Sequence, residues 1–259
     1  MNNSFVSPPA GRLQAHRGAS GLAPENTMIA FDLARRLGAG WIETDASLIG
    51  DGTVVLFHDD TLERCTDGRG LLAETSWDEL CRLDAGSWFD PLYAGQAVPR
   101  LETLLDYAAS HDMGINLELK THLADAADAM PLASAVAAVL KARPAEALPK
   151  MVVSSFDWAA ITAMQQLMPM LPRAMLTEEE VGPAVIAARE AEAIAVHAWY
   201  DHFASADAVS AAVAEIADAG LACYLYTVND PVLAKPLWQA GLSGLISDFP
   251  NRFPDLLSA

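Results

Sequence analysis

Eight short apolar segments recur along this chain and alternate with stretches of a different pattern. The short segments are typical of buried strands, and most stretches between them repeat apolar residues every three to four positions, as helices do. A length of 259 residues suits one α/β barrel, for which about 250 residues is typical. The count therefore predicts an α/β fold of the (β/α)8 TIM-barrel type, as a single domain over residues 1–259. The expected strands lie at residues 12–15, 41–45, 114–120, 151–155, 173–176, 193–197, 222–228 and 244–247.

The helices expected between these strands carry recognisable ends. Asp157 precedes a helix predicted over residues 158–167, and Asp230 followed by proline begins a helix that should end at Gly241. The other predicted helices cover residues 28–35, about 124–142, and about 206 to 220.

Two features interrupt the alternation near the ends of early strands. The second strand continues to Leu48, turns at Asp51-Gly52 and returns towards His58, which predicts a hairpin with His58 opposite Asp45. An insertion follows over about residues 59–99, too long for a barrel loop without structure of its own. A capping box beginning at Ser76 predicts a short helix there. The insertion is expected to be either a lid over a substrate or a packed surface loop.

Charge and cysteine content exclude several classes of partner and site. The net charge of −18 argues against a nucleic-acid backbone or an anionic membrane as partner. Three cysteines without metal-ligand spacing indicate neither a disulfide framework nor a zinc site. The first residues lack the pattern of a secretory signal, and no apolar stretch has the length of a membrane span. We therefore expect a cytoplasmic protein without stable membrane association.

Acidic residues cluster at the ends of two expected strands. Glu43 and Asp45 are two positions apart and so share one face of a strand, and Glu118 and Lys120 repeat this arrangement. Three carboxylates at a barrel mouth would repel one another unless a cation neutralised them, and such oxygen ligands suit Mg2+ or Ca2+. The alternative is a mouth without metal, in which Glu43 and Glu118 pair with Arg17 and Lys120.

Histidines also stand at strand ends, where barrels keep their active sites. His16 and Arg17 follow the first strand, and a base that titrates near neutrality beside a fixed cation suits phosphate chemistry. The alternative is that His16 is a core histidine and Arg17 a surface charge. His197 ends the sixth strand and is predicted to point towards the mouth, either contacting a substrate or serving in packing.

Taken together, these residues form a pattern that resembles the glycerophosphodiester phosphodiesterase family. The resemblance spans nearly the whole chain and keeps the family's order. It implies a metal-dependent phosphodiesterase that cleaves small deacylated phospholipids, such as glycerophosphocholine, to sn-glycerol 3-phosphate and an alcohol. The matching residues are His16-Arg17-Gly18, Pro24-Glu25-Asn26-Thr27, Glu43 and Asp45, Asp51-Gly52 with His58-Asp59, Pro99 with Leu101-Glu102, Glu118 and Lys120, Thr227-Val228-Asn229, and residues 244–250.

The same resemblance implies a role for each matching site residue. It implies that the metal ligands are Glu43, Asp45 and Glu118. It also implies that His16 and His58 are the acid/base pair, and that Arg17 and Lys120 contact the phosphate. Of the two histidines, His58 is expected to be the acid because carboxylates lie near it, and His16 the base because Arg17 follows it. One departure concerns Tyr226, where similar proteins usually carry tryptophan in the glycerol pocket.

Two other functions fit parts of the pattern. A related barrel phospholipase acting on intact lipids would keep the same metal and histidines but should show an exposed apolar rim. A non-catalytic phosphate-binding barrel would normally have lost a member of the site, and none is missing here.

Overall fold

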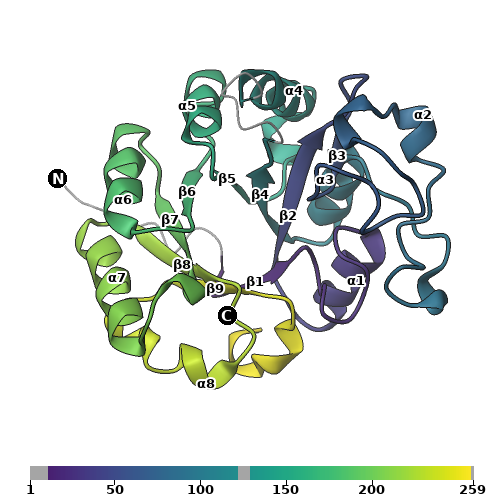
Figure 1. Cartoon of the computed structure of the whole chain (residues 1–259). Coiled ribbons are helices and arrows are strands. Elements are labelled where there is room, and N and C mark those ends of the chain that lie inside the picture. The colour runs from purple at the N-terminus through teal and green to yellow at the C-terminus, as the bar shows by residue number, and fades with distance from the viewer. Residues whose placement is uncertain (1–10, 122–128, 258–259) are drawn as a thin grey trace.

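The computed structural model describes residues 11–121 and 129–257, and its centre is a closed barrel of eight parallel strands (Figure 1). The first strand pairs with the second on one side and with the last on the other, which closes the barrel. This confirms the predicted TIM barrel. Its strands are β1 (Leu13–His16), β2 (Trp41–Leu48), β4 (Gly114–Leu119), β5 (Met151–Ser155), β6 (Arg173–Thr177), β7 (Ala195–Trp199), β8 (Ala222–Tyr226) and β9 (Gly244–Ser247).

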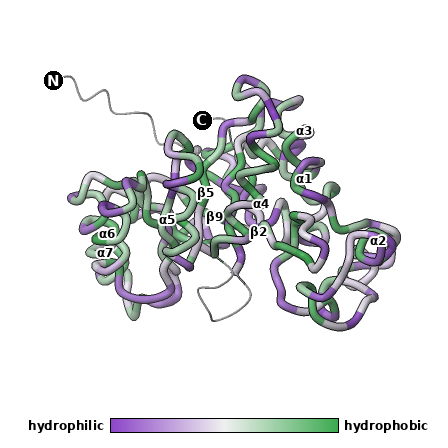
Figure 2. Tube along the Cα trace, turned by 90° about the horizontal axis from the view of Figure 1, so that it is seen from above, coloured by the Kyte–Doolittle hydropathy of each residue, from purple (hydrophilic) through white to green (hydrophobic). Residues whose placement is uncertain are grey.

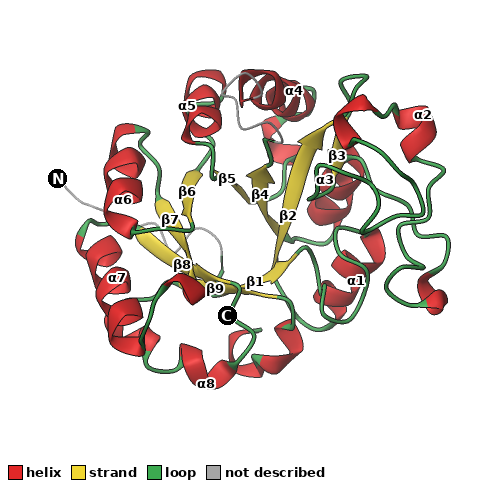
Figure 3. Ribbon diagram, viewed as in Figure 1, coloured by secondary structure: helices red, strands yellow, loops and turns green. Residues whose placement is uncertain are grey.

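Helices surround the barrel and alternate with its strands (Figure 3). The helix predicted at residues 158–167 is confirmed, and Asp157 caps it by accepting from Ala159 N. The helix expected from about residue 124 is described from Ala129, and its predicted first residues lie outside the described part. The helices are α1 (Met28–Arg36), α3 (Leu101–Ser110), α4 (Ala129–Lys141), α5 (Trp158–Leu167), α6 (Val181–Glu190), α7 (Ala206–Asp218) and the short α8 (Pro231–Ala234).

The main hydrophobic core lies between the strands and this ring of helices. Ile42 and Ile115 from neighbouring strands, for example, belong to the same buried cluster as Phe31 of α1 and Leu104 of α3. Burying apolar side chains of this size stabilises the fold by roughly 1.5–3 kcal/mol each. Among the described residues, no helix is both long and apolar enough to cross a membrane.

The hairpin after β2 forms as predicted, but with a different register. Strand β3 (Val54–Leu56) runs antiparallel to β2. Asp45 O accepts from Phe57 N at 3.0 Å, so Asp45 stands opposite Phe57 and the predicted pairing with His58 was wrong by one residue. The cause is the loop: Ile49 N bonds Thr53 O, which leaves three residues in the turn where two were expected.

The insertion at residues 59–99 packs on a core of its own, beside the barrel. Leu62, Leu72 and Leu80 join Val55 of β3 and Phe57, which follows that strand, in a second buried cluster. The predicted short helix is α2 (Trp77–Leu80), with the capping box in place. Figures 1 and 2 both show α2 at the edge of the molecule, away from the barrel centre. This arrangement favours the packed surface loop over the lid.

Candidate active site

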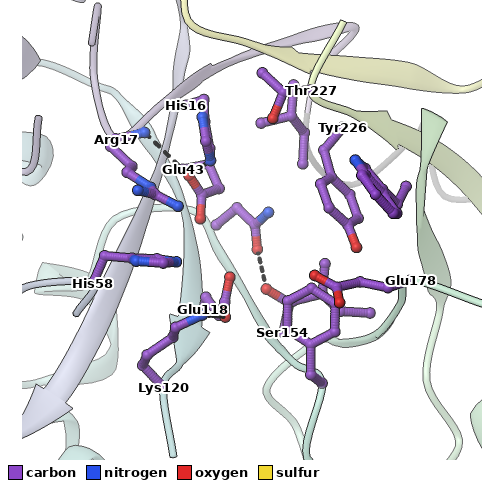
Figure 4. A pocket seen from close by; sticks show the side chains of 15 residues that line it. His16, Arg17, Glu43, His58, Glu118, Lys120, Ser154, Glu178, Tyr226 and Thr227 are labelled. Atoms are coloured by element: carbon purple, nitrogen blue, oxygen red, sulfur yellow. Dashed lines mark hydrogen bonds and ion pairs between the residues drawn. The ribbon is translucent and has the colours of Figure 1, made fainter. Parts of the chain in front are cut away.

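A pocket of about 150 Å³ opens at the carboxyl ends of the barrel strands. Figure 4 shows the labelled histidines and the charged residues in or just after β1, β2 and β4 on one side, and Tyr226 and Glu178 on the other. The described residues that line it include six of the seven predicted site residues and no residue of the insertion 59–99. They are His16, Arg17, Glu43, His58, Asn116, Glu118, Lys120, Ser154, Phe156, Leu176, Glu178, Trp199, Tyr226, Thr227 and Ile246.

The turn after β1 holds Arg17 in a strained conformation at the mouth. Arg17 has a φ of 54°, in the left-handed region that residues other than glycine rarely adopt. Gly18 follows with a φ of 83°, and a Cβ there would lie 2.7 Å from the backbone of Ala30. The turn therefore needs glycine and brings α1 close to β1. Backbone strain of this kind is commonly found at functional sites.

Strand register brings the three predicted metal ligands together. Asp45 and Glu118 are partners on the neighbouring strands β2 and β4, and Glu43 lies two residues earlier on β2. The three side chains are buried, and each offers an oxygen within 4.8 Å of the others. Asp45 Oδ1 is buried and accepts no hydrogen bond from any described residue. An acceptor left open beside two more carboxylates fits a hard divalent cation.

The charge of this cluster is only partly balanced by protein groups. Burial, with Asp45 and Glu118 nearby, raises the pKa of Glu43 well above its usual range. Burial and Asp45 likewise raise the pKa of Glu118 to about 7. Burial also opposes ionisation of Asp45, but Arg17 and other nearby cations lower its pKa to about 2. Three buried carboxylates thus compete for too little positive charge, which a metal ion would relieve.

Arg17 and Lys120 are the two cations that face the cluster. Lys120 Nζ lies 3.3 Å from Glu118 Oε1, the ion pair expected for a mouth without metal. The Arg17 guanidinium contacts Asp45 rather than Glu43, with Nε 3.2 Å from Asp45 Oδ2, and its Nη1 donates to Glu25 Oε1 at 2.8 Å. Only the backbone N of Arg17 donates to Glu43 Oε2, at 3.1 Å. Because Arg17 is shared with Glu25, the pairing expected for a metal-free mouth is only half realised.

Each of the two predicted acid/base histidines is held by a carboxylate at Nδ1. His16 Nδ1 lies 2.6 Å from Asp248 Oδ1, and His58 Nδ1 lies 2.7 Å from Asp59 Oδ1. A carboxylate at Nδ1 keeps the proton of a neutral imidazole on that atom and leaves Nε2 free to accept one. His16 Nε2 faces the cluster, 3.9 Å from Glu43 Oε2. Both imidazoles line the pocket, so both are placed for proton transfer.

These contacts remove the reason for expecting His58 to be the acid. His16 also bonds a carboxylate, so a nearby carboxylate does not distinguish the two. Burial lowers the pKa of His58, and although Asp45 and Asp59 act in the opposite direction, the net shift is downwards. The structure therefore favours a neutral His58.

His197 does not reach the pocket. Its side chain is fully buried inside the barrel, with Nδ1 3.5 Å from Asn116 Nδ2 and its ring 5.1 Å from that of Tyr224. Asn116 itself donates to Gln14 and accepts from Ser154, at 2.8 and 2.9 Å. Of the two roles expected for His197, the buried packing role is the one observed.

The wall opposite the charged groups is mostly apolar and aromatic. Tyr226 donates to Thr177 O at 2.9 Å and packs edge-on against Phe156, with centroids 5.9 Å apart. Trp199 and the exposed Glu178 complete this side. The pocket therefore has one face of charged groups and an opposite face that is mainly aromatic but includes the Glu178 carboxylate.

Several residues of the site were given no role from the sequence. Asp248 fixes His16 and is itself bonded by Ser20 Oγ and Asn229 Nδ2, at 3.0 and 2.7 Å. Its place just after the last strand was a usable signal, because a closed barrel sets that strand beside β1. Glu25 carried no such signal, since its partners Arg17 and Arg64 lie in loops whose course periodicity does not predict. Asp59 was expected only as one of the carboxylates near His58, which it contacts.

Comparison with known proteins places this pocket in a family. A model of the glycerophosphoryl diester phosphodiesterase family matches residues 16–252. A glycerophosphodiester phosphodiesterase of Bacillus subtilis (strain 168) is 30% identical over 267 residues, covering 96% of this chain and 87% of that protein.

Solved structures agree in fold and size. An Oleispira antarctica phosphodiesterase, in complex with the product sn-glycerol-3-phosphate, superposes with a TM-score of 0.86 at 33% identity, covering 96% of this chain and 98% of that one. A glycerophosphodiester phosphodiesterase from Agrobacterium tumefaciens str. C58 gives a TM-score of 0.75 at 28% identity, with 95% and 99% covered. The chain therefore belongs to the glycerophosphoryl diester phosphodiesterase family and is an enzyme of that family.

Proposed function

We propose that this enzyme hydrolyses glycerophosphodiesters to sn-glycerol 3-phosphate and an alcohol, using a divalent cation and two histidines. The observation that carries the proposal is the meeting of three buried carboxylates with two imidazoles in one pocket, each imidazole fixed at Nδ1 by a further carboxylate. The family match and the product named for the Oleispira antarctica relative support the substrate class. All of these groups lie in the single barrel domain, which we propose as the functional unit.

Glu43, Asp45 and Glu118 would hold the cation. All three are hard oxygen donors, the ligands that Mg2+ or Ca2+ prefers, and the open Asp45 Oδ1 fits such an ion. When bound there, a divalent cation supplies Lewis acidity towards a phosphoryl oxygen.

Arg17 and Lys120 bind the phosphodiester anion and stabilise the charge that develops on its oxygens during reaction. Neighbouring carboxylates outweigh the effect of burial and raise the pKa of both side chains, so both stay charged. The opposite wall, with Phe156, Trp199 and Tyr226, contacts the carbon skeleton of the substrate.

The two histidines divide the proton transfers. The Nε2 of one histidine accepts the proton of the oxygen that attacks phosphorus. The Nε2 of the other donates a proton to the alkoxide of the alcohol, which leaves as its bond to phosphorus breaks. Each transfer typically contributes about 10²–10⁴-fold to the rate. Asp248 and Asp59 orient the rings and stabilise the imidazolium form.

The size and lining of the pocket favour a small substrate over an intact lipid. A volume of about 150 Å³ is small beside the roughly 300–1,000 Å³ of sites for drug-sized ligands. Of the large hydrophobic side chains exposed in the described part of the chain, only Trp199 lines the pocket. Among the residues that the structure describes, none therefore forms the apolar rim expected of a phospholipase around this pocket.

Release of glycerol 3-phosphate from glycerophosphocholine tests the proposal. We expect release by the purified protein with Mg2+ or Ca2+, loss of release in EDTA, and its return when metal is added back. Lysophosphatidylcholine serves as the parallel substrate. Hydrolysis of the lysolipid alone would support the phospholipase, and no hydrolysis of glycerophosphocholine, glycerophosphoethanolamine or glycerophosphoglycerol with either metal would refute the proposal.

A further inference from the structure

Arg64, in the insertion, binds two carboxylates that lie beside the charged residues of the pocket. Its guanidinium donates to Asp59 through Nε at 2.5 Å and Nη2 at 2.7 Å. It also donates to Glu25 through Nη1 at 2.7 Å and Nη2 at 2.8 Å. One side chain thus binds two carboxylates, each through two hydrogen bonds.

Both carboxylates hold a residue of the pocket. The oxygen of Asp59 that accepts from Arg64 Nη2 also bonds His58 Nδ1 at 2.7 Å. The oxygen of Glu25 that accepts from Arg64 Nη2 also accepts from Arg17 Nη1 at 2.8 Å. A continuous chain of contacts therefore runs from His58 to Arg17, and Arg64 is its central member.

We propose that Arg64 is a positioning residue, which fixes His58 and Arg17 for the reaction without touching the substrate. The inference rests on the function proposed above and gives the insertion a role other than that of a lid. Arg64 does not line the pocket, so its effect must pass through Asp59 and Glu25.

The geometry sets this contact apart from an ordinary surface ion pair. The Arg64 side chain is 44% exposed, and isolated pairs at that exposure contribute little. Its partners are better shielded, with Glu25 at 12% and Asp59 at 20% exposure. Burial opposes ionisation of Asp59, yet its hydrogen bonds, that from Arg64 foremost, keep its pKa below the usual range. A bidentate guanidinium can bind two carboxylates at once, whereas the lysine ammonium, a point charge, has no such fork.

Four variants test the proposal: Arg64→Ala and Arg64→Lys, with Arg69→Ala and Arg69→Lys as matched controls. Arg69 is an exposed residue of the same insertion that takes part in none of these contacts. Both Arg64 variants should lower kcat for glycerophosphocholine by about 10–100-fold, the range typical for loss of a partner that orients site residues. The Arg69 variants should match the parent, and so should metal affinity in all four proteins, because the metal ligands are unchanged.

Two further measurements distinguish positioning from simple stabilisation. Added guanidinium, below denaturing concentrations, should restore part of the activity of Arg64→Ala, whereas a stability defect would show as a lowered Tm without such rescue. The Nδ1 proton of His58, followed by NMR, should be visible in the parent and lost through exchange in Arg64→Ala. This second signal does not depend on turnover, so it tests Arg64 even in a protein without the proposed activity.

The two hypotheses fail in different ways. A parent that releases no glycerol 3-phosphate refutes the proposed function, while the His58 proton still decides the role of Arg64. An active parent with an unchanged kcat in Arg64→Lys refutes the positioning role alone, and this variant decides the matter if Arg64→Ala does not fold. Persistence of the His58 Nδ1 proton in Arg64→Ala also refutes it.

Discussion

His197 should make the barrel sensitive to acid, and replacing it should remove part of that sensitivity. The side chain is fully buried, and burial lowers its pKa to about 3. Histidine in an unfolded chain titrates near 6.5. Below pH 6.5 the unfolded chain therefore gains a proton that the folded barrel cannot accept, so the free energy of unfolding must fall as the pH falls.

The structure gives the size of this effect. Each pH unit below 6.5 destabilises the fold by about 1.4 kcal/mol, until the pH approaches the folded pKa. Between pH 6.5 and 4.5 His197 alone should reduce the free energy of unfolding by about 2 kcal/mol, because the unfolded histidine is already half protonated at pH 6.5. No correction for solvent screening is needed, because the imidazole has no contact with water. Above pH 7 both states are neutral and the contribution vanishes.

Urea denaturation of the parent and of His197→Gln at pH 7.5, 6.5, 5.5 and 4.5 measures the difference. The variant loses some packing at every pH, so the test is the slope with pH and not the absolute stability. Glu118, with a pKa raised to about 7, titrates in the same window with the opposite sign. It is present in both proteins and cancels in the comparison. If the free energy of unfolding changes with pH in the same way in the two proteins, the conclusion that His197 is buried in its neutral form is refuted.

Three further predictions concern the site. Glu43→Gln or Asp45→Asn should abolish turnover and lower Mg2+ affinity, measured by calorimetry. Loss of a residue that only supports a metal ligand costs about 10–100-fold in affinity, and loss of a ligand itself should cost at least as much. Binding as tight as that of the parent contradicts the ligand assignment. A nitrophenyl phosphodiester, whose phenolate leaves without a proton, should be cleaved well by His16→Ala but not by His58→Ala, because a neutral His58 suits the base; rescue of the His58 variant instead reverses these roles. Trp88→Ala in the insertion should leave the relative rates for choline, ethanolamine and glycerol diesters unchanged, since no insertion residue lines the pocket. A changed substrate preference would instead support the hypothesis that the insertion is a lid.

The barrel and its charged mouth were predictable because both follow from periodicity. Side chains alternate along a strand, so Glu43 and Asp45 had to share a face whatever the rest of the fold. Parallel strands end at one rim, so Glu118 on a neighbouring strand had to join them, and the observed register sets it directly beside Asp45. These constraints are local or follow from barrel closure, and a single sequence contains them.

The contacts that tune the histidines were not predictable in the same way. The environment of His58 depends on a loop that holds three residues where two were expected, and the change moves the residue opposite Asp45 to Phe57. Its pKa depends on the balance of burial against nearby charges, which becomes known only from three-dimensional distances. Both observations weaken the reasons for expecting His58 to be the acid, and the division of roles between the two histidines stays a prediction.

The insertion shows why composition could not separate a lid from a packed loop. Both need aromatic and turn-forming residues, and they differ only in where the apolar side chains point. Leu62, Leu72 and Leu80 lie in the second core with Val55 of β3 and with Phe57, which follows β3. Because β3 leads directly to His58, this core anchors the strand that delivers the imidazole, and Arg64 then fixes the ring through Asp59. An insertion beside the barrel can thus govern turnover through the position of a histidine, and substitutions in its core should affect kcat more than substrate preference.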